Sequence, residues 1–562
     1  MRYTEHNVDF CVVGGGMAGI CAALSAARHG IKTILVQDRG VLGGNASSEI
    51  RMWICGAHGK DNRETGIIEE LILENYYRNP GLSYPLWDAV LYEKVAMQEN
   101  LLLLLNTSCF DASLENGRIM SIKAWQSPCE TMHTVKAKYF ADCSGDSILA
   151  PLTGAHFRYG REAKSEFDEN IAPETADRKT MGMSCLFQVR ETDTYQKFTP
   201  PEWAYKYPSD DDIPFREHDL SSNFWWIELG GEGDCIHDTD KYRGELLKIA
   251  YGIWDHVKNH GDHGADNYRL EWIGLLPGKR ESRRYVGRYT VCQRDVETGG
   301  DFDDTVAYGG WSMDDHFPAG IEHKASYPTI FHPAPSPWGI PFRALYSENI
   351  ENLMFAGRNI SVTHAALSSS RVMATCALLG QATGTAAAQL IHDGGTFDDI
   401  NVEKLQDTLM ADDCFIPGRR RKVSKLSERL ECNSALVHNG FDRKDENKWT
   451  GHRGDYLEYK SDTPFELSAV RLVFDSDLNR NYHNMPCCIR LHENKYKLPE
   501  TLIKDFDIVL TNADGSKETL RTRENRNRLV TLDIHGEYTS VKFIPLETYG
   551  AEDFGVFGFE VQ

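Results

Sequence analysis

The 562-residue sequence lacks several features that would place a protein in a functional class at once. It has no excess of basic residues: the net charge at pH 7 is −22, which argues against binding to a phosphate backbone. No apolar run reaches the roughly 18 residues that a membrane-spanning helix needs. The segment from Met1 to Asp9 has no basic region followed by an apolar stretch, so we expect no signal peptide. These absences predict a cytoplasmic protein that binds neither nucleic acid nor membrane.

The 14 cysteines also lack a pattern. Only Cys487 and Cys488 are adjacent, and no CxxC pair is present to hold zinc or an iron–sulfur cluster. Scattered cysteines in a cytoplasmic protein are expected to be reduced thiols. We therefore assign no metal site from the sequence.

The pattern of apolar residues changes once along the chain. Residues 8–415 have glycine-rich turns and alanine-rich helical stretches, which indicate an α/β fold. A basic segment follows, and we interpret residues 419–430 as a solvated linker. Residues 431–562 contain short strands of alternating polarity, which predict an antiparallel β-sandwich.

A glycine-rich turn near the N-terminus carries the first chemical signal. Gly14, Gly16 and Gly19 form a G-x-G-x-x-G motif after a predicted strand over 10–13, and a helix is predicted from Met17 to His29. In such a motif the first glycine permits a tight turn, and the second lets the backbone approach a pyrophosphate. The third allows close packing of helix and strand, and the helix N-terminus, here Met17-Ala18, faces the phosphate charge. The motif predicts a dinucleotide site.

The second predicted strand, over 32–36, ends at the position where an acidic residue usually binds the adenosine ribose. By count this position is Gln37, followed by Asp38 and Arg39. An amide can still hydrogen-bond the ribose hydroxyls, and Asp38 can share that role. We include all three residues in the predicted cofactor site.

Four later segments resemble flavoproteins with two dinucleotide-binding folds and a glutathione-reductase-like FAD domain. They are the Leu-Gly-Gly-Asn-Ala-Ser-Ser-Glu turn at 42–49, the Ala-Asp-Cys-Ser-Gly-Asp turn at 141–146 and the segments 352–361 and 368–388. Together with Arg-Glu-Ser-Arg-Arg at 280–284, they make the chain similar to the FAD-dependent oxidoreductase family over residues 6–418. The resemblance implies FAD as cofactor and adds these contact residues: Gly43, Gly44, Asn45, Ser48, Ser144, Gly145, Asp146, Gly357, Arg358, Asn359, Ser370 and Met373.

The resemblance also implies a domain arrangement. Residues 1–155 and 345–418 would form a Rossmann-type FAD-binding domain, and 156–344 would form an inserted α+β substrate or cap domain. No second glycine motif of comparable quality is present, so a separate NAD(P)H site is not expected. The electron acceptor is unknown, and homo-oligomer formation is left open.

Three histidines are candidate bases for oxidation at a flavin, because the pKa of imidazole lies near working pH. His364 is the first candidate, because the resemblance implies that its segment lies against the flavin ring. His58 follows the Gly-Gly-Asn turn, where Cys55 is a further candidate contact or flavin attachment point. His316 lies in the predicted cap. For each histidine, a purely structural role is the alternative. Arg280, Arg283 and Arg284 could clamp an anionic substrate, but we favour an internal ion-pair network for them.

The C-terminal region, from about 430 onward, loosely resembles a discoidin or galactose-binding-like jelly roll, with a structural or dimer-forming role as its alternative. The combined hypothesis is an FAD-dependent oxidoreductase acting on a small-molecule substrate, a carbohydrate or polyol. One alternative is a glycoside-cleaving enzyme that uses transient flavin oxidation followed by elimination. Another is a carbohydrate-binding protein with a vestigial flavin fold.

Overall fold

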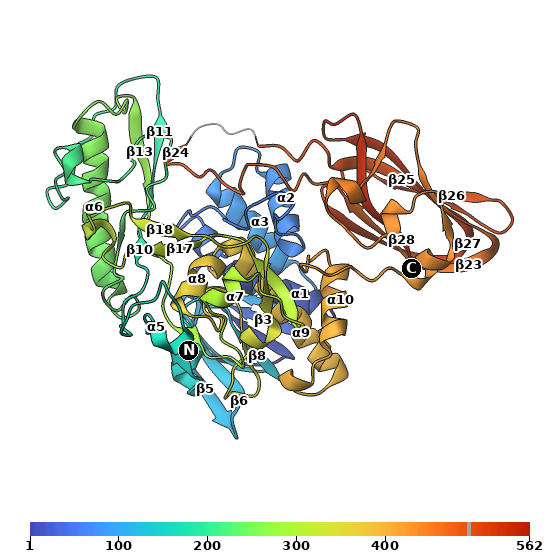
Figure 1. The fold of residues 1–562 in the computed structure, drawn as a ribbon, viewed down its shortest axis with the longest axis horizontal. Helices are drawn as coiled ribbons and strands as arrows, with labels where there is room; N and C mark the ends of the chain where they lie inside the picture. The colour runs from blue at the N-terminus through green and yellow to red at the C-terminus, as the bar shows by residue number, and fades with distance from the viewer. Residues whose placement is uncertain (492–495) are drawn as a thin grey trace. The chain divides into compact units, whose positions relative to one another are not determined.

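The computed structural model describes residues 1–491 and 496–562. They form two compact units (Figure 1). Unit 1 contains residues 1–58, 81–405 and 483–494, and unit 2 contains residues 59–80, 406–482 and 495–562. The units are defined by spatial contacts rather than by sequence order. Residues 59–80 therefore belong to unit 2, although the segments on both sides of them belong to unit 1, and residues 483–494 belong to unit 1, although their neighbours belong to unit 2.

A five-stranded parallel sheet organises unit 1, in the order β20-β8-β2-β3-β4 (Figure 1). Most of its residues are apolar and buried, as is typical of parallel strands covered on both faces. The strands are β2 (Phe10–Val13), β3 (Thr33–Val36), β4 (Leu101–Leu104), β8 (Tyr139–Asp142) and β20 (Leu353–Phe355). This arrangement confirms the predicted Rossmann-type architecture.

Two small-residue helices pack closely against each other in this unit: α1 (Met17–Arg28) and α9 (Met373–Asp393). A Cβ atom at Gly380 would lie 2.0 Å from the carbonyl oxygen of Ala18, and one at Gly384 would lie 2.2 Å from that of Ala22. Glycine is therefore required at both positions for the helix backbones to approach. This contact brings the start of α9, far along the chain, next to the start of α1.

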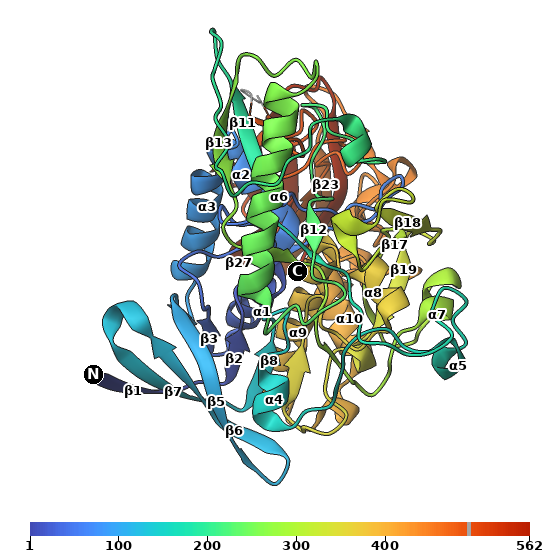
Figure 2. The same ribbon diagram turned by 90° about the vertical axis from the view of Figure 1, so that its left-hand side faces the viewer.

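A second sheet of unit 1 has the order β1-β7-β6-β5 and lies outside the parallel sheet in Figure 2. Its strands are β1 (Arg2–Asn7), β5 (Thr107–Glu115), β6 (Arg118–Gln126) and β7 (Thr131–Lys136). The pairs of β5 with β6 and of β6 with β7 are antiparallel, whereas β1 and β7 are parallel.

The long helix α6 (Thr239–Asn259) dominates the region predicted as the cap (Figure 2). Its buried face packs Trp254 against Phe187 and Phe198. The antiparallel pair β11 (Phe187–Glu191) and β13 (Tyr268–Ile273) lies beside it, and β24 (Arg490–Leu491) extends this pair.

Short strands and helices complete this unit. The strands are β9 (Phe157–Arg158), β10 (Met183–Ser184), β12 (Glu228–Leu229), β14 (Gly278–Lys279), β15 (Arg284–Tyr285), β16 (Thr305–Gly309), β17 (Met313–His316), β18 (Thr329–His332) and β19 (Trp338–Pro341). The helices are α3 (Tyr84–Ala96), α4 (Leu149–Thr153), α5 (Lys164–Phe167), α7 (Gln293–Glu297) and α8 (His364–Ser370).

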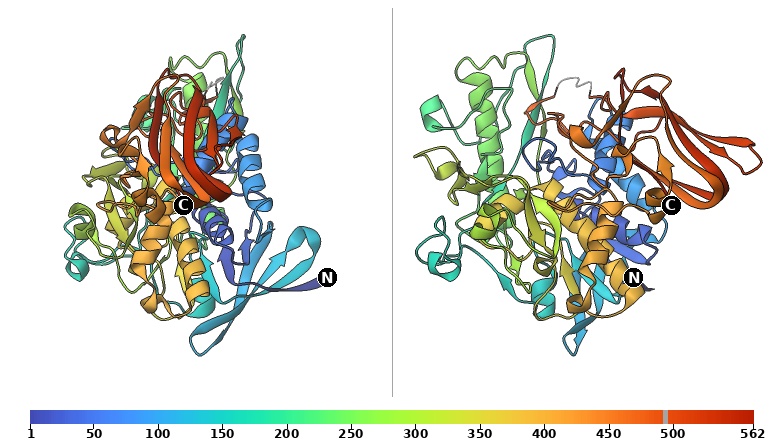
Figure 3. Two further views of the ribbon diagram at one scale, coloured as in Figure 1. Left: turned by 90° about the vertical axis from the view of Figure 1, so that its right-hand side faces the viewer. Right: turned by 45° about the vertical axis from the view of Figure 1, so that its right-hand side comes forward.

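Unit 2 is built on an antiparallel sheet, whose strands are coloured orange to red in Figure 3. The strand order is β22-β28-β23-β27-β25-β26, with β21 paired to β23. The strands are β21 (Glu431–Cys432), β22 (Trp449–Gly451), β23 (Leu457–Phe474), β25 (Ile503–Thr511), β26 (Lys517–Thr522), β27 (Leu529–Thr548) and β28 (Phe554–Val561). The helices α2 (Ile67–Arg78), α10 (Val402–Ala411) and α11 (Lys425–Arg429) belong to it wholly or in large part. The predicted C-terminal β-sandwich is confirmed.

The predicted solvated linker is wrong at Arg421. This side chain is 3% exposed and forms ion pairs with Asp442, at 2.7 Å, and with Glu560. A guanidinium is buried only where carboxylates compensate its charge, and both partners belong to the same unit. The basic segment is therefore part of the folded unit around the sandwich.

Two further observations concern the whole described chain. None of its helices is long and apolar enough to cross a bilayer. None of its described cysteines is joined in a disulfide.

Candidate active site

A cavity of about 660 Å³ opens in unit 1 at the carboxyl ends of the parallel strands. The loops after β2, β3, β8 and β20 line it, together with the start of α9. The crevice beyond the carboxyl ends of parallel strands is where α/β folds bind their ligands, and this volume suits an organic cofactor.

The glycine motif forms one wall of the cavity. Gly14 has a φ of 104°, and a Cβ atom there would lie 2.5 Å from the carbonyl carbon of Cys143. A Cβ atom at Gly19 would lie 1.8 Å from the carbonyl oxygen of Gly14, so Gly19 serves close packing and does not itself line the cavity. Gly16 does line the cavity, and a Cβ atom there would meet only the Cα atom of Gly44, at 3.9 Å. At this wall, the motif therefore exposes backbone to the cavity and leaves open the space that a side chain would otherwise fill.

Two helix N-termini face the cavity without a capping side chain. Gly16 is the N-cap of α1 and Val372 is the N-cap of α9, and both residues line the cavity. The first amide groups of a helix have no partner inside the helix and carry partial positive charge. The two termini therefore suit the negatively charged parts of a ligand.

Most of the predicted cofactor residues line this cavity. They are Gly14, Gly16, Met17, Ala18, Gln37, Asp38, Arg39, Gly43, Gly44, Asn45, Ser144, Gly145, Asp146, Gly357, Arg358 and Met373. Gly19, Ser48, Asn359 and Ser370 are not among the lining residues. The Ser48 amide donates to Asp88 at 3.0 Å, and the Asn359 amide donates to the carbonyl of Asp142 at 3.3 Å, so these two residues support the site rather than line it.

The division of roles between Gln37 and Asp38 differs from the prediction. The Gln37 side chain accepts from the Gly15 amide at 2.7 Å and donates to the Val41 carbonyl at 3.1 Å. Both ends of its amide are therefore engaged with the neighbouring turns at Gly15 and Val41. Asp38 lines the cavity with an exposed carboxylate and is the better placed acceptor for ribose hydroxyls.

Charged side chains tie the loop after β8 to the loop after β20. Asp146 pairs with Lys279 at 2.7 Å and with Arg358 at 2.9 Å. Burial opposes ionisation, but Arg358 and Lys279 hold the pKa of Asp146 below its ordinary value. Arg358 also lines the cavity, so this ion-paired guanidinium is next to the space for a ligand.

Comparison with known proteins agrees with this geometry. The model of the family described as FAD dependent oxidoreductase matches residues 9–409. The chain belongs to this family. The matched range contains every wall of the cavity, so FAD is its cofactor, and the glycine turns, helix N-termini and Asp38 are the residues that would hold it.

Individual relatives are distant. A glycerol-3-phosphate dehydrogenase from Mycobacterium leprae is 33% identical over 73 residues, which are 13% of this chain and 12% of that protein. The structure of a geranylgeranyl bacteriochlorophyll reductase-like protein from Thermoplasma acidophilum is 13% identical, covers 73% of this chain and 85% of its own, and has a TM-score of 0.34. A family 32 carbohydrate-binding module from Streptococcus pneumoniae is 12% identical, covers 23% of this chain and 82% of its own, and has a TM-score of 0.18.

A second wall of the cavity is built around His316 on β17. His316 is 3% exposed, and its Nδ1 lies 2.7 Å from a carboxylate oxygen of Glu228. Its Nε2 lies 3.3 Å from Asp314, which also pairs with Arg371 at 2.9 Å. The ring of Trp225 meets the imidazole edge-on, with 5.0 Å between ring centroids. Of these residues, all but Glu228 line the cavity.

Strand geometry explains which side chains reach this wall. β17 and β18 pair antiparallel, with His316 opposite Thr329 and Asp314 opposite Phe331. Successive side chains of a strand point to opposite faces, so Asp314 and His316 share the cavity face. The residue between them, Asp315, points the other way and lies 3.1 Å from His364.

His364, the first candidate base, does not line the cavity. Its Nδ1 lies 2.9 Å from Glu281, and its Nε2 lies 3.1 Å from Asp315. Burial alone would lower the pKa of His364, but the two carboxylates raise it to about 10. The ring is therefore an imidazolium with both nitrogens occupied, and it has no lone pair to accept a proton. This geometry argues against His364 as the base and assigns it to an internal ion-pair network.

The raised pKa of His364 predicts a pH-dependent stability. A folded-state pKa of about 10, above the ordinary 6.5, stabilises the fold fully below about pH 6.5, and that contribution is lost as the pH rises toward 10. We expect the free energy of unfolding to fall by up to several kcal/mol across this window. In His364→Gln the fall should be much smaller, whereas His156→Gln, which removes an exposed histidine paired with Glu348, should keep the wild-type slope. Denaturant unfolding at a series of pH values measures this, and equal slopes in all three proteins would contradict the ion-pair assignment.

The remaining candidates around residue 55 have different positions. His58 is exposed, stacks on Trp311 with 4.3 Å between ring centroids, and is absent from the cavity lining. Cys55 lines the cavity, but burial raises the pKa of its thiol to about 12, so it is neither a base nor a thiolate nucleophile near neutral pH.

The arginines at 280–284 are mainly internal, as favoured by the sequence. Arg284 is fully buried and pairs with Glu162 at 3.1 Å. Arg283 lies over the ring of Phe157. Arg280 differs, because it lines the cavity while pairing with Glu228 at 3.4 Å and donating to Ser184 at 2.8 Å. Sequence reasoning did not identify Glu228, Asp314 and Arg371 as site residues. Their residue types and spacing do not indicate a shared site, which forms only when the fold brings β17 and α9 together.

Proposed function

We propose that the protein oxidises a polyhydroxylated small molecule, a carbohydrate or polyol, with His316 as the base. The observation that carries this proposal is the Glu228–His316 pair beside the cavity. Asp314, which contacts His316, also pairs with Arg371, and Arg371 directly precedes the uncapped N-terminus of α9. Bound FAD supplies the acceptor for a hydride. The protein must then take up the accompanying proton.

His316 suits proton uptake because its ring is oriented. The buried Glu228 carboxylate lies 2.7 Å from Nδ1 and accepts its proton, so in the neutral ring Nε2, which lies 3.3 Å from Asp314, is the nitrogen that would take up the substrate proton. Once His316 is protonated, Glu228 and Asp314 compensate the imidazolium charge. Arg280 lies against Glu228 and holds the pKa of that carboxyl below its ordinary value despite burial, so Glu228 remains an acceptor. Glu228 thereby positions His316.

The lining of this wall supports a polyhydroxylated substrate. Trp225, Trp311, Tyr327 and Phe331 offer aromatic surfaces, on which the C–H faces of sugar rings can pack. Asp314, Arg280 and Arg371 lie among them as acceptor and donors for hydroxyl groups. A cavity with mixed aromatic and charged lining suits a polar ring better than a hydrocarbon.

A substrate panel tests the proposal. FAD-loaded protein is mixed anaerobically with aldoses, ketoses, polyols and glycosides, and the visible flavin bands are followed. We expect one class to bleach the bands in a saturable manner and to yield an oxidised product in a 1:1 ratio with flavin. A fatty acid and an aromatic amine serve as controls that should leave the bands unchanged.

The outcomes separate the competing functions. Bleaching by the non-sugar controls alone would overturn the carbohydrate assignment while keeping the oxidoreductase. Release of an aglycone from glycosides without net flavin reduction would replace oxidation by the transient mechanism with elimination.

A further inference from the structure

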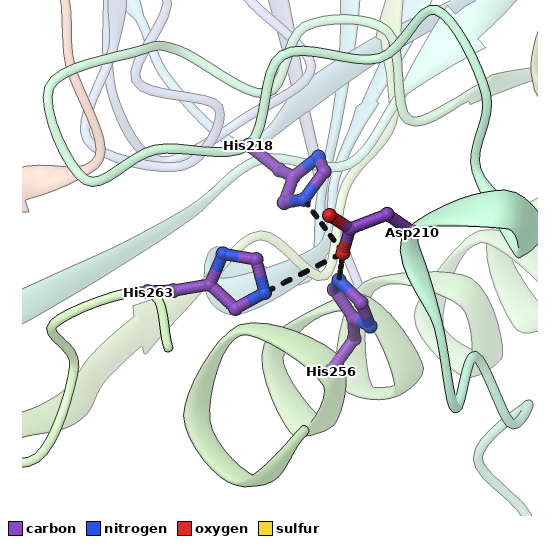
Figure 4. Close-up of side chains that lie close together, drawn as sticks. All are labelled: Asp210, His218, His256 and His263. Atoms are coloured by element: carbon purple, nitrogen blue, oxygen red, sulfur yellow. Dashed lines mark ion pairs between the residues drawn. The ribbon is translucent and has the colours of Figure 1, made fainter. Parts of the chain in front are cut away.

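A group of ligating side chains lies apart from the cavity lining: Asp210, His218, His256 and His263 (Figure 4). Asp210 begins a short 3-10 turn (Asp210–Asp212), and His218 follows in the next loop. His256 lies in the last turn of α6, and His263 follows that helix. All four belong to unit 1.

The ligand atoms converge on a single point. The Oδ1 atom of Asp210 lies 3.5 Å from Nε2 of His218, 3.1 Å from Nε2 of His256 and 3.7 Å from Nε2 of His263. All four atoms lie within 4.8 Å of one another. A tetrahedral zinc ion with metal–ligand bonds of about 2.0–2.1 Å has its ligand atoms about 3.3 Å apart. The three distances from the Asp210 carboxylate to the imidazole nitrogens are close to this spacing.

Main-chain carbonyls orient two of the rings. Nδ1 of His218 lies 2.6 Å from the carbonyl of Arg216, and Nδ1 of His256 lies 2.7 Å from the carbonyl of Tyr207. A carbonyl can only accept, so each Nδ1 carries the proton and, in the neutral ring, each Nε2 presents its lone pair to the centre. Hydrogen bonds of this kind, which fix the tautomer of the ring, are the usual outer support of metal-binding histidines.

The centre lacks the hydrogen bonds that would otherwise satisfy it. The Nε2 atoms of His256 and His263 are buried and have no hydrogen-bond partner, although both lie within ion-pair distance of Asp210. The His256 side chain is 1% exposed. Leaving buried polar atoms unsatisfied costs about 1–3 kcal/mol each, and a cation at the centre would satisfy both nitrogens and the carboxylate together.

A glycine between His256 and His263 lets the chain turn back, so that the His263 ring reaches the other three ligands. Gly261 has a φ of 87°, which glycine adopts readily. A Cβ atom there would lie 3.0 Å from Nε2 of His263, so the imidazole occupies space that only glycine leaves free.

We propose that Asp210, His218, His256 and His263 bind one divalent transition-metal ion, zinc by preference, in a tetrahedral structural site. Three imidazoles and one carboxylate form a ligand set that zinc prefers over magnesium or calcium. Four protein ligands leave no open position, so the ion stabilises structure rather than catalysing a reaction.

The ion would tie the irregular segment around 205–220 to the end of α6. That segment leads to the cavity, because the carbonyl of Glu217, beside His218, accepts from the indole of Trp226 at 2.8 Å, next to the cavity-lining Trp225. This site could not be predicted from the sequence, because its ligands come from separated segments without a zinc-motif spacing.

Metal analysis of the full chain tests the proposal. Chelator-treated protein is given zinc, passed through a desalting column and analysed by mass spectrometry, and the Kd is measured by competition with a chromophoric chelator. We expect one zinc per chain and a higher Tm with zinc, because an ion that binds only the folded state stabilises it. Cobalt in place of zinc should give the intense visible bands of tetrahedral cobalt, at longer wavelengths than the oxidised flavin bands.

Two variants make the result specific. Asp210→Asn changes a side chain that is 72% exposed, so it leaves the core intact, and it should weaken zinc binding at least tenfold. His237→Ala removes an exposed histidine paired with Asp234 just before α6 and should bind zinc like the wild type. Failure to retain zinc, equal zinc affinity in Asp210→Asn and wild type, or equally tight binding of magnesium would each overturn the proposal. None of these readouts depends on flavin or substrate.

Discussion

His316→Gln is expected to slow substrate-dependent flavin reduction by about 10²–10⁴-fold while leaving FAD content unchanged, because a positioned base contributes a factor of this size. Glutamine keeps a polar side chain near Glu228 and Asp314 but cannot accept the substrate proton. The measurement is the anaerobic rate of flavin bleaching with the most reactive compound of the panel, at saturating concentration. The loss should therefore appear in the rate at saturation rather than in the concentration needed to reach it.

His58→Gln is the matched control for this experiment. His58 is exposed and outside the cavity lining, so its replacement should leave the rate within about twofold of the wild-type value. His364→Gln should reduce stability at neutral pH more than it reduces the rate per folded molecule. If His316→Gln reduced flavin at the wild-type rate while His58→Gln did not, the base would have to be reassigned.

Gly16→Ala is expected to weaken FAD binding at least tenfold without unfolding the protein. A Cβ atom at Gly16 has open space around it, with only Gly44 within 4 Å, and Gly16 lines the cavity. The added methyl group therefore costs the protein little by itself but occupies space next to the N-terminus of α1, where the pyrophosphate is expected. FAD titration of the apoprotein, followed by quenching of flavin fluorescence, gives the Kd.

A glycine outside the cavity provides the control for this substitution. Gly81→Ala adds the same methyl group where nothing lies within 4 Å and φ is not positive, and it should retain wild-type FAD affinity. Circular dichroism of both variants checks the fold. Wild-type FAD affinity in Gly16→Ala would contradict the placement of the cofactor against α1.

The sequence predicted the nucleotide half of the site because local rules determine it. Gly14 and Gly19 are required by backbone conformation and packing within one strand–turn–helix segment, and the structure agrees with both assignments. Spacing alone does not show that the Gln37 side chain also serves the neighbouring turns at Gly15 and Val41.

The proposed catalytic half depends on contacts between distant segments. The sequence ranks His364 ahead of His316 as a candidate base, but the alternation of β17 sends Asp315 to His364 and turns Asp314 and His316 to the cavity. Glu228 completes the pair from a different strand, β12. Such long-range pairing cannot be predicted from residue type or spacing in a single sequence.

The C-terminal unit shows the same limit. The sequence predicts short strands within residues 431–562, whereas Leu529–Thr548 form one continuous strand, β27. Arg421 was interpreted as solvated because basic runs usually are, whereas Asp442 and Glu560 bury it. In both cases tertiary contacts override the local pattern.

The most direct test of the account is the visible absorption spectrum of the purified protein after incubation with FAD and removal of unbound cofactor. We expect oxidised flavin bands at one FAD per chain, retained through desalting. Protein that is folded by circular dichroism but retains no flavin would contradict the assignment of the cavity, and with it the roles proposed for Gly16, Asp38 and His316.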